Sequence, residues 1–370
     1  MNYPTRPGQP VLDRLTFASP DRRRVRGCLR RPSGPRLSGV VRATRALQRL
    51  TLVACATWSV VSSGVAMAAS AHATAAATGP TAVANSASSS ASANRAEAAL
   101  NASAVAAPDA GGGVDPRRAF LLRAVFAQDV TRKLRVPASE QSAYAGRLQA
   151  ALGANTLGNL SGEYVVLVDR NANVQALFVY FRAAPADTWQ MIGASPVSTG
   201  RPGEYDHFIT PLGVFEHTPA NMDFRSEGTL NENHIRGYGK RDMRIFDLGW
   251  AQGERGWGKG GVSQMRFQMH ATDPDRLEPL LGIRHSKGCV RIPASLNTFL
   301  DHYGILDAEY AALVDSGKSL WLLKSDRQIT PWAGRYIVVV DSQRKSRPGW
   351  TPAPGGKAQA KVPAGADTAD

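Results

Sequence analysis

Residues 264–292 read QMRFQMHATDPDRLEPLLGIRHSKGCVRI. Over the first seven of them, Met265, Phe267 and Met269 alternate with polar residues, the pattern of a β-strand that buries one face. His270 lies on the polar side of this alternation. We therefore expect its imidazole to point toward solvent or a groove rather than into the core.

The same segment ends in a second short strand, predicted by Val290 and Ile292. If these two side chains point inward, Cys289 and Arg291 lie on the other face of the strand, because successive residues of a strand alternate. The pattern therefore places a cysteine and a strand-end histidine on the polar sides of their strands.

Short strands recur along much of the chain. Runs rich in β-branched and aromatic residues predict them over 164–168, 175–181, 190–197, 214–217, 320–323 and 336–340. Gly- and Pro-rich loops separate them, notably 198–213 and 226–261, and long helices do not alternate with them. We expect a mainly β fold, a mixed-sheet sandwich or barrel-like domain, and not a doubly wound parallel sheet.

A short helical N-terminal extension is predicted ahead of these strands, over residues 115–159. Asp115 and Pro116 suit an N-cap and the first helical position, and Pro137 is expected to end the helix. A second helix should follow. The side chains expected on the buried faces of the two helices are Phe120, Ala124, Ala127, Val130, Leu134, Tyr144, Leu148 and Ala151.

The net charge of +14 comes mainly from residues 1–49, which hold 12 Arg and 2 Asp. A nucleic-acid-binding fold would carry its basic excess on the folded part, so we expect no nucleic-acid partner. An uncharged apolar run follows over residues 50–69 and contains the small-residue site Ala66-Met67-Ala68. This organisation predicts a basic n-region and signal peptide over residues 1–68, with export to the periplasm or cell envelope.

Other interpretations of this N-terminal region stay open. An uncleaved anchor would hold the chain at the membrane, although six Ser, Thr and Gly residues make the run only moderately apolar. Lipid attachment at Cys55 is disfavoured, because Arg49 lies too close and the apolar run continues past the cysteine. The length of the n-region also leaves open a true start downstream of Met1.

Composition divides the rest of the chain. Residues 69–114 are mostly Ala, Ser, Thr and Gly, which predicts a disordered tether. Residues 160–325 are expected to form the main domain, and residues 326–341 to supply a terminal strand. Residues 342–370, rich in Pro, Gly, Lys and Ala, are expected to be a disordered tail.

Cleavage of the signal would leave Cys289 as a single thiol in an oxidising compartment, where structural cysteines come in pairs. Such a cysteine cross-links chains, is buried and inert, or is a nucleophile. A thiol with a pKa near ~8.5 needs a base at neutral pH, and His270 suits that role. Lys287 and Arg291 would favour the thiolate, and Gly288 suits a loop whose N–H groups face an oxyanion.

These residues resemble the signature of the L,D-transpeptidases, cysteine enzymes that cross-link bacterial peptidoglycan. The residues that match are His270, Ser286, Gly288, Cys289, Val290 and Arg291. A second part of the family pattern lies upstream, in Ser198-Thr199-Gly200 and Thr210-Pro211-Leu212-Gly213-Val214-Phe215. The resemblance covers about residues 160–325 and implies the family's catalytic domain there.

The resemblance implies a role for each residue. Cys289 is the expected nucleophile, His270 the general base, Gly288 part of the oxyanion loop and Ser286 a supporting hydroxyl. Arg291 is expected to bind a substrate carboxylate. The family usually has His where this sequence has Lys287, to which we assign an electrostatic or substrate-contacting role.

The implied reaction is attack by Cys289 on the carbonyl that precedes the terminal D-alanine of a peptidoglycan tetrapeptide stem. The resulting thioester would pass to an amine of another stem, or to a lysine of a wall-anchored protein, in cell wall biogenesis and the control of cell shape. No cofactor is expected. With water as the acceptor, the same site would be an L,D-carboxypeptidase.

Two other kinds of protein stay in competition with this enzyme. One is a non-catalytic peptidoglycan-binding module, in which Lys287 marks lost activity. The other is a zinc site of His270, His285 and Cys289, which the sequence supports poorly because it offers no fourth ligand and no short ligand spacing. His285 could partly substitute for the histidine that the family has at position 287, but the sequence favours its being an incidental loop residue.

Overall fold

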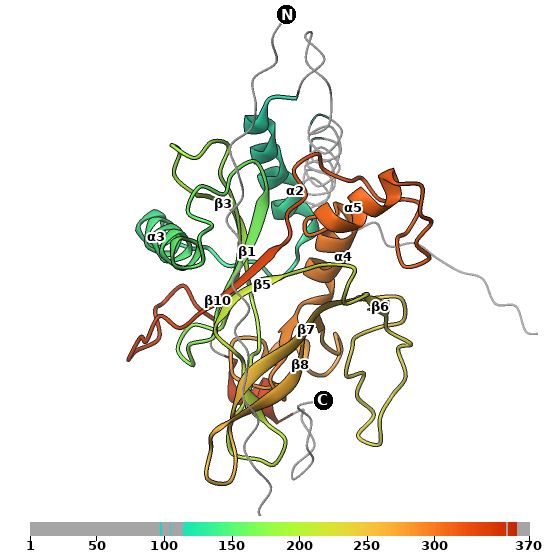
Figure 1. Cartoon of the computed structure of the whole chain (residues 1–370). Coiled ribbons are helices and arrows are strands. Elements are labelled where there is room, and N and C mark those ends of the chain that lie inside the picture. Colours follow the sequence, from blue (N-terminus) through green and yellow to red (C-terminus); the bar gives the residue numbers. More distant parts are fainter. Residues whose placement is uncertain (1–96, 98–103, 105–113, 353, 361–370) are drawn as a thin grey trace, which may run out of the picture. The chain divides into compact units, whose positions relative to one another are not determined.

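The computed structural model describes residues 97, 104, 114–352 and 354–360 (Figure 1). The predicted signal peptide, nearly all of the predicted tether and the last ten residues lie outside the described residues. All described residues belong to one of the two compact units into which the chain divides, Ala77–Asp370. Within them, no helix combines the length and apolar character needed to cross a bilayer.

The described part of the chain is mainly β, with two open mixed sheets (Figure 1). The first sheet has the order β3-β2-β1-β10-β5, and its only parallel pair is β1 with β10. Its strands are β1 (Tyr164–Asp169), β2 (Ala176–Phe181), β3 (Gln190–Pro196), β5 (Gly213–Glu216) and β10 (Tyr336–Val340).

The second sheet has the order β4-β7-β8-β9, with β6 paired to β7. Here β8 and β9 run parallel, and the long β7–β8 pair is antiparallel. Its strands are β4 (Phe208–Ile209), β6 (Phe224–Arg225), β7 (Arg244–Arg255), β8 (Val262–Ala271) and β9 (Val290–Ile292).

Helices cover both faces of the first sheet (Figure 1). Side chains of α3 pack with Val165 and Leu167 of β1, and side chains of α2 and α4 pack with the alternate residues Val166 and Val168. The helices are η1 (Pro116–Leu121), α2 (Leu122–Asp129), α3 (Ala138–Ala154), η2 (Glu278–Leu280), α4 (Ala294–His302), α5 (Ala308–Asp315) and α6 (Gly356–Gln359).

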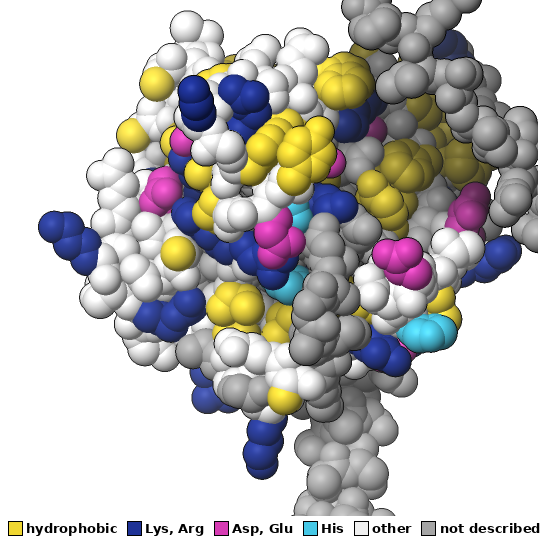
Figure 2. Space-filling view, turned by 90° about the horizontal axis from the view of Figure 1, so that it is seen from below, with side chains coloured by type: hydrophobic (Ala, Val, Ile, Leu, Met, Phe, Trp, Pro, Cys, Tyr) yellow, Lys and Arg dark blue, Asp and Glu magenta, His cyan; other side chains and the backbone are white. Residues whose placement is uncertain are grey.

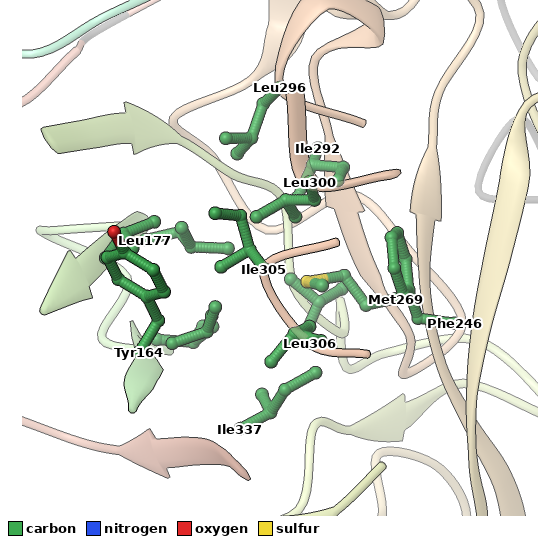
Figure 3. Close-up of a cluster of buried hydrophobic side chains, with 14 of the residues drawn as sticks. Tyr164, Leu177, Phe246, Met269, Ile292, Leu296, Leu300, Ile305, Leu306 and Ile337 are labelled. Atoms are coloured by element: carbon green, nitrogen blue, oxygen red, sulfur yellow. The ribbon is translucent and has the colours of Figure 1, made fainter. Parts of the chain in front are cut away.

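The two sheets share one hydrophobic core. Figure 3 shows Tyr164, Leu177 and Ile337 of the first sheet on one side of this core, and Phe246, Met269 and Ile292 of the second on the other. Burial of such side chains is the main favourable term in folding. Because β8 and β9 present alternate residues to this core, their remaining side chains must lie on the opposite face of the second sheet.

Most strands predicted from the sequence are present, but three expectations about strands are wrong. The short strand β4 lies inside the expected loop 198–213. Residues 320–323 form turns rather than a strand. β7 lies inside the expected loop 226–261, whose glycines argued against a strand. Gly249 fits within β7 because the register shifts between Asp247 and Trp250, and a glycine with φ +80° occupies the resulting bulge.

The helical extension also differs in detail from the prediction. The Asp115 side chain accepts a hydrogen bond from the Arg117 backbone N–H, as expected of an N-cap. However, the first turns form a 3₁₀-helix, and α2 ends at Asp129, well before Pro137. This changes the helical phase, so η1 and α2 bury Ala119, Leu122, Val125 and Phe126. Of the residues predicted for the first helix only Val130 is fully buried, whereas Tyr144 and Leu148 of the second are buried as predicted.

The prediction of a disordered tail is wrong for residues 342–352. The Trp350 ring packs edge-on against Tyr144 of α3 and Phe178 of β2, with ring centroids 6.0 Å apart in both pairs. The Trp350 contacts and three hydrogen bonds between side chains and backbone order a segment whose composition alone is typical of disorder.

Candidate functional site

The site is built on the parallel pair β8–β9. In their register, Met269 lies opposite Val290 and His270 opposite Arg291. Opposed residues point to the same face, so His270 and Arg291 share the face away from the core. Cys289 precedes Val290 and lies on this face as well, since its side chain lines the same pocket as theirs.

This pocket has a volume of about 330 Å³ and is closed on one side by the loop between β6 and β7. The loop contributes Thr229, Leu230, Asn231, Ile235, Gly237 and Tyr238. The sheet side contributes His270, Ser286, Lys287, Cys289 and Arg291. The structure thus brings together five of the six predicted site residues as lining, and the sixth, Gly288, lies between two of them.

Exposure of the key side chains is lower than the sequence suggested. His270 retains 4% of its accessible surface and Arg291 only 1%, so of the two expected surroundings, solvent or a groove, both side chains have the groove. The Cys289 thiol is half-buried. The side chains lie on the expected face of the strands, but the loop over residues 226–243 packs against that face. The alternation within β8 and β9 could not predict this packing.

Ser286 and Gly288 shape the turn that presents the thiol. The Ser286 hydroxyl donates to the Cys289 carbonyl at 2.6 Å and accepts from the Gly288 N–H at 3.1 Å. Gly288 has φ +131°, and a Cβ there would lie 2.7 Å from Met265 Cε. The Gly288 N–H is bound to Ser286, so in this conformation the loop must offer another N–H to an oxyanion, and Gly288 itself provides the positive φ of the turn.

The two upstream segments of the family pattern converge on this turn. The Thr210 hydroxyl accepts from the Gly200 N–H at 2.9 Å and donates to the Gly288 carbonyl at 2.7 Å. Ser198 and Gly200 also form β-bridges with Arg291 and Ser286. Sequence segments that lie about 80 residues apart therefore act as one support for the Cys289 turn.

The proton state of His270 follows from its surroundings. Nδ1 lies 2.8 Å from the carbonyl oxygen of Ala271, which can only accept, so Nδ1 carries the proton and Nε2 holds the lone pair. Burial, with the nearby Arg291 guanidinium, lowers the pKa of His270 to about 3. The resting imidazole is therefore neutral at physiological pH, with its Nε2 lone pair unprotonated.

Cys289 is also neutral at rest. Burial raises the pKa of its thiol to about 11, against the opposing effects of a Gln268 backbone hydrogen bond and of Arg291. Arg291 favours the thiolate, as expected, but desolvation outweighs its charge, so the net shift of the Cys289 pKa is upward. The site holds a thiol and an uncharged imidazole, not a preformed ion pair.

Sequence reasoning missed a polar chain beside the thiol. The Tyr238 hydroxyl donates to Gln268 at 3.2 Å, and the Gln268 amide donates to Asp247 at 3.0 Å. The Tyr238 ring also lies 4.5 Å from the His270 ring, centroid to centroid. The alternation of β8 placed Gln268 on the polar face of its strand. Tyr238 and Asp247 could not be predicted, because both lie in the segment expected to be a loop.

The other predicted candidates contribute less. His285 is buried, its N–H donates to the Thr199 carbonyl, and its own carbonyl accepts from Arg291. Its place is therefore in the support of the turn. Across residues 114–352 and 354–360, no group of three His, Cys, Asp or Glu side chains is arranged to hold a metal ion.

The pocket is basic. Figure 2 shows Lys, Arg and His side chains, together with a few Asp and Glu side chains, on the face seen from below. Within the pocket, Lys287 and the buried Arg291 are the cations, and the pocket lining includes no Asp or Glu. An anionic group of a ligand would therefore be stabilised there.

Comparisons with known proteins add little to this geometry. No family model matches the chain, and no curated protein is similar to it in sequence. Among solved structures, a fused Zn-dependent amidase/peptidase/peptidoglycan-binding domain-containing protein from Clostridium acetobutylicum is 9% identical, with 66% of this chain and 93% of that chain covered. The TM-score is 0.23, so this likeness carries no argument about fold or function.

Proposed function

We propose that this protein is a cysteine acyltransferase of the L,D-transpeptidase type that acts on peptidoglycan stem peptides outside the cytoplasm. The observation that carries the proposal is the shared pocket of Cys289, His270 and Arg291 on one face of β8–β9. It supplies a nucleophile, a neutral base and a cation in one place. The resemblance in sequence supplies the substrate class.

In the proposed first step, Cys289 attacks the carbonyl carbon before the terminal D-alanine. The thiol proton passes to Nε2 of His270 as the S–C bond forms, because neither group is ionised beforehand. The tetrahedral intermediate then expels D-alanine, whose amine takes the proton back from His270. A thioester on Cys289 remains, and the oxyanion requires an N–H of the turn other than that of Gly288.

In the proposed second step, an amine attacks the thioester and its proton moves to His270. Collapse of the intermediate forms the new amide, breaks the S–C bond and returns the proton to the sulfur. Arg291 and Lys287 supply positive charge for a substrate carboxylate. The acceptor amine belongs to a second stem peptide or to a wall protein.

The test is incubation of the purified chain with tetrapeptide muropeptides, followed by mass spectrometry. Release of D-alanine together with cross-linked dimers supports transpeptidation, and Cys289→Ala should abolish both. Release without dimers in the presence of excess acceptor would instead identify an L,D-carboxypeptidase.

A β-lactam of the carbapenem class separates the enzyme from a non-catalytic binding module. The proposed nucleophile should give a stable mass increase on the peptide that contains Cys289, absent in Cys289→Ala. A native fold that shows neither this adduct nor D-alanine release would overturn the enzymatic assignment.

A further inference from the structure

An exposed aromatic and polar strip continues from the pocket along the outer face of the second sheet. Trp250 on β7 keeps 66% of its surface exposed although it lies within a strand. It pairs with Arg266 of β8, and the Arg266 guanidinium lies 5.7 Å from the centre of the indole ring. Gln252 and Gln264 form the next exposed pair.

This strip shares the face of the nucleophile. Arg266 and Gln268 lie on the face of β8 that carries His270, and paired residues of β7 point the same way. The bulge at Gly249 keeps Trp250 on that face, since Asp247 before it bonds Gln268 and Trp250 after it contacts Arg266. Bulges near active sites commonly re-aim a side chain in this manner.

The chemistry of the strip favours an uncharged, hydroxyl- and amide-bearing ligand. The Arg266 guanidinium is already held by Asp247, with Nε 2.9 Å from a carboxylate oxygen, so the pair has no net charge. The two glutamines offer amide donors and acceptors, and the indole offers a flat apolar surface. These are the groups that bind the polar edges and the C–H face of a sugar ring.

We propose that Trp250, with Arg266, Gln252 and Gln264, is a subsite for the glycan strand that carries the stem peptide. This inference rests on the proposed function and extends it. Continuing the β8–β9 register by one residue places Cys289 opposite Gln268, which pairs with Asp247 of β7. Cys289 and Trp250 are therefore separated by about two strand spacings across the sheet and a short distance along β7, roughly 10–12 Å in all. Three extended stem residues span about 10 Å, which joins a sugar on the indole to the attacked carbonyl.

Binding measured without chemistry tests the subsite. The probe is glycan strands of bacterial peptidoglycan from which the stem peptides have been removed, immobilised on a sensor. The full chain carrying Cys289→Ala is compared with the same chain carrying also Trp250→Ala. We expect the Kd to rise about tenfold, and Trp250→Phe to give an intermediate value.

The matched control is Trp321→Ala in the Cys289→Ala background. Trp321 is 74% exposed and lies in a turn after α5, outside the second sheet, so its removal should change the Kd less than twofold. Equal Kd values for Trp250→Ala and its parent, equal losses for both tryptophans, or no glycan binding by the parent would each overturn the subsite.

The two proposals fail in different ways. Because Cys289→Ala has no thiol, the glycan measurement does not depend on acyl transfer. Absence of D-alanine release from the native chain would overturn the proposed function and leave the Trp250 effect as a finding. Circular dichroism and thermal unfolding of each variant establish that its fold is retained.

Discussion

The hydroxyl of Thr210 and the carbonyl of Gly288 are joined by a buried 2.7 Å hydrogen bond across 78 residues of sequence. The same hydroxyl accepts from the Gly200 N–H, so one side chain links both upstream segments to the turn that carries the nucleophile. Support of this kind fixes a reactive group because its partners lie in rigid sheet elements.

Replacement of Thr210 by Val should leave two buried backbone groups without their partner. We expect a loss of about 1–3 kcal/mol in the free energy of unfolding and a fall of about tenfold to hundredfold in the rate of β-lactam acylation. Urea unfolding and time-resolved mass spectrometry measure the two effects. Thr210→Ser keeps the hydroxyl and should retain most of both, and equal losses in Ser and Val variants would contradict the role of the hydrogen bonds.

Gly288→Ala should disturb the turn directly. At φ +131° an added Cβ is strained and lies within 3.0 Å of atoms of Met265 and Phe208. We expect a destabilisation of about 1–3 kcal/mol and an acylation rate reduced about a hundredfold. Gly349→Ala, where a Cβ meets nothing within 4 Å, is the control and should behave as the native chain. An active Gly288→Ala variant would show that the turn tolerates other conformations.

The Cys289 thiol should react slowly at neutral pH and faster as pH rises. With a pKa of about 11, its thiolate fraction grows about tenfold per pH unit between pH 7 and 10. The rate of iodoacetamide labelling, followed by mass spectrometry on the peptide containing Cys289, should rise in proportion. A rate that levels off below pH 8 would reveal a thiolate already paired with a protonated His270.

The buried His270 makes the folded state sensitive to acid. Its folded pKa, about 3, lies below the ordinary value near 6.5, so between these pH values the unfolded chain binds more protons. Stability should therefore decrease as pH falls from 6.5 toward 3, with a contribution from this residue of up to about 1.4 kcal/mol per pH unit. Urea unfolding from pH 7 to pH 4.5 should give a shallower slope for His270→Gln, and identical slopes would contradict the buried neutral imidazole.

Arg244 should be the most sensitive charged residue away from the pocket. It is fully buried, with Asp223, Asp301 and Asp307 at 2.6, 3.3 and 2.8 Å. Arg244→Met leaves these carboxylates undercompensated and should cost about 3–5 kcal/mol of unfolding free energy. The exposed Arg117 pairs with Asp115, and Arg117→Met should cost less than about 0.5 kcal/mol. Comparable losses in the two variants would contradict the importance of burial.

The fold could be predicted where a pattern is local. Alternation located β8 and β9, and β-rich runs located most strands of the first sheet. The pattern is misleading at β7, because glycines in a bulged strand resemble a loop, and at residues 320–323, where an apolar run has no partner strand. Composition is also misleading at residues 342–352, where Trp350 packs against the rings of Tyr144 and Phe178, which are remote in sequence.

The candidate site divides in the same way. Side-chain alternation assigned Cys289, His270 and Arg291 to the polar sides of their strands, because that property belongs to each strand alone. Only the β8–β9 pairing puts them on one face. Their burial, and the pKa directions that result from it, depend on the 226–243 loop and on Arg291 lying opposite His270. Tyr238, Asp247 and Trp250 had no sequence signal, since their importance arises from which strand they pair with.

By itself, the sequence determined the chemistry available to this protein: one thiol in the main domain, a histidine 19 residues before it, and the segments that accompany them. Only the tertiary structure decided the state of that chemistry. Desolvation under the covering loop keeps both the thiol and the imidazole uncharged, and the cost of burying a charge depends on neighbours that are remote in sequence.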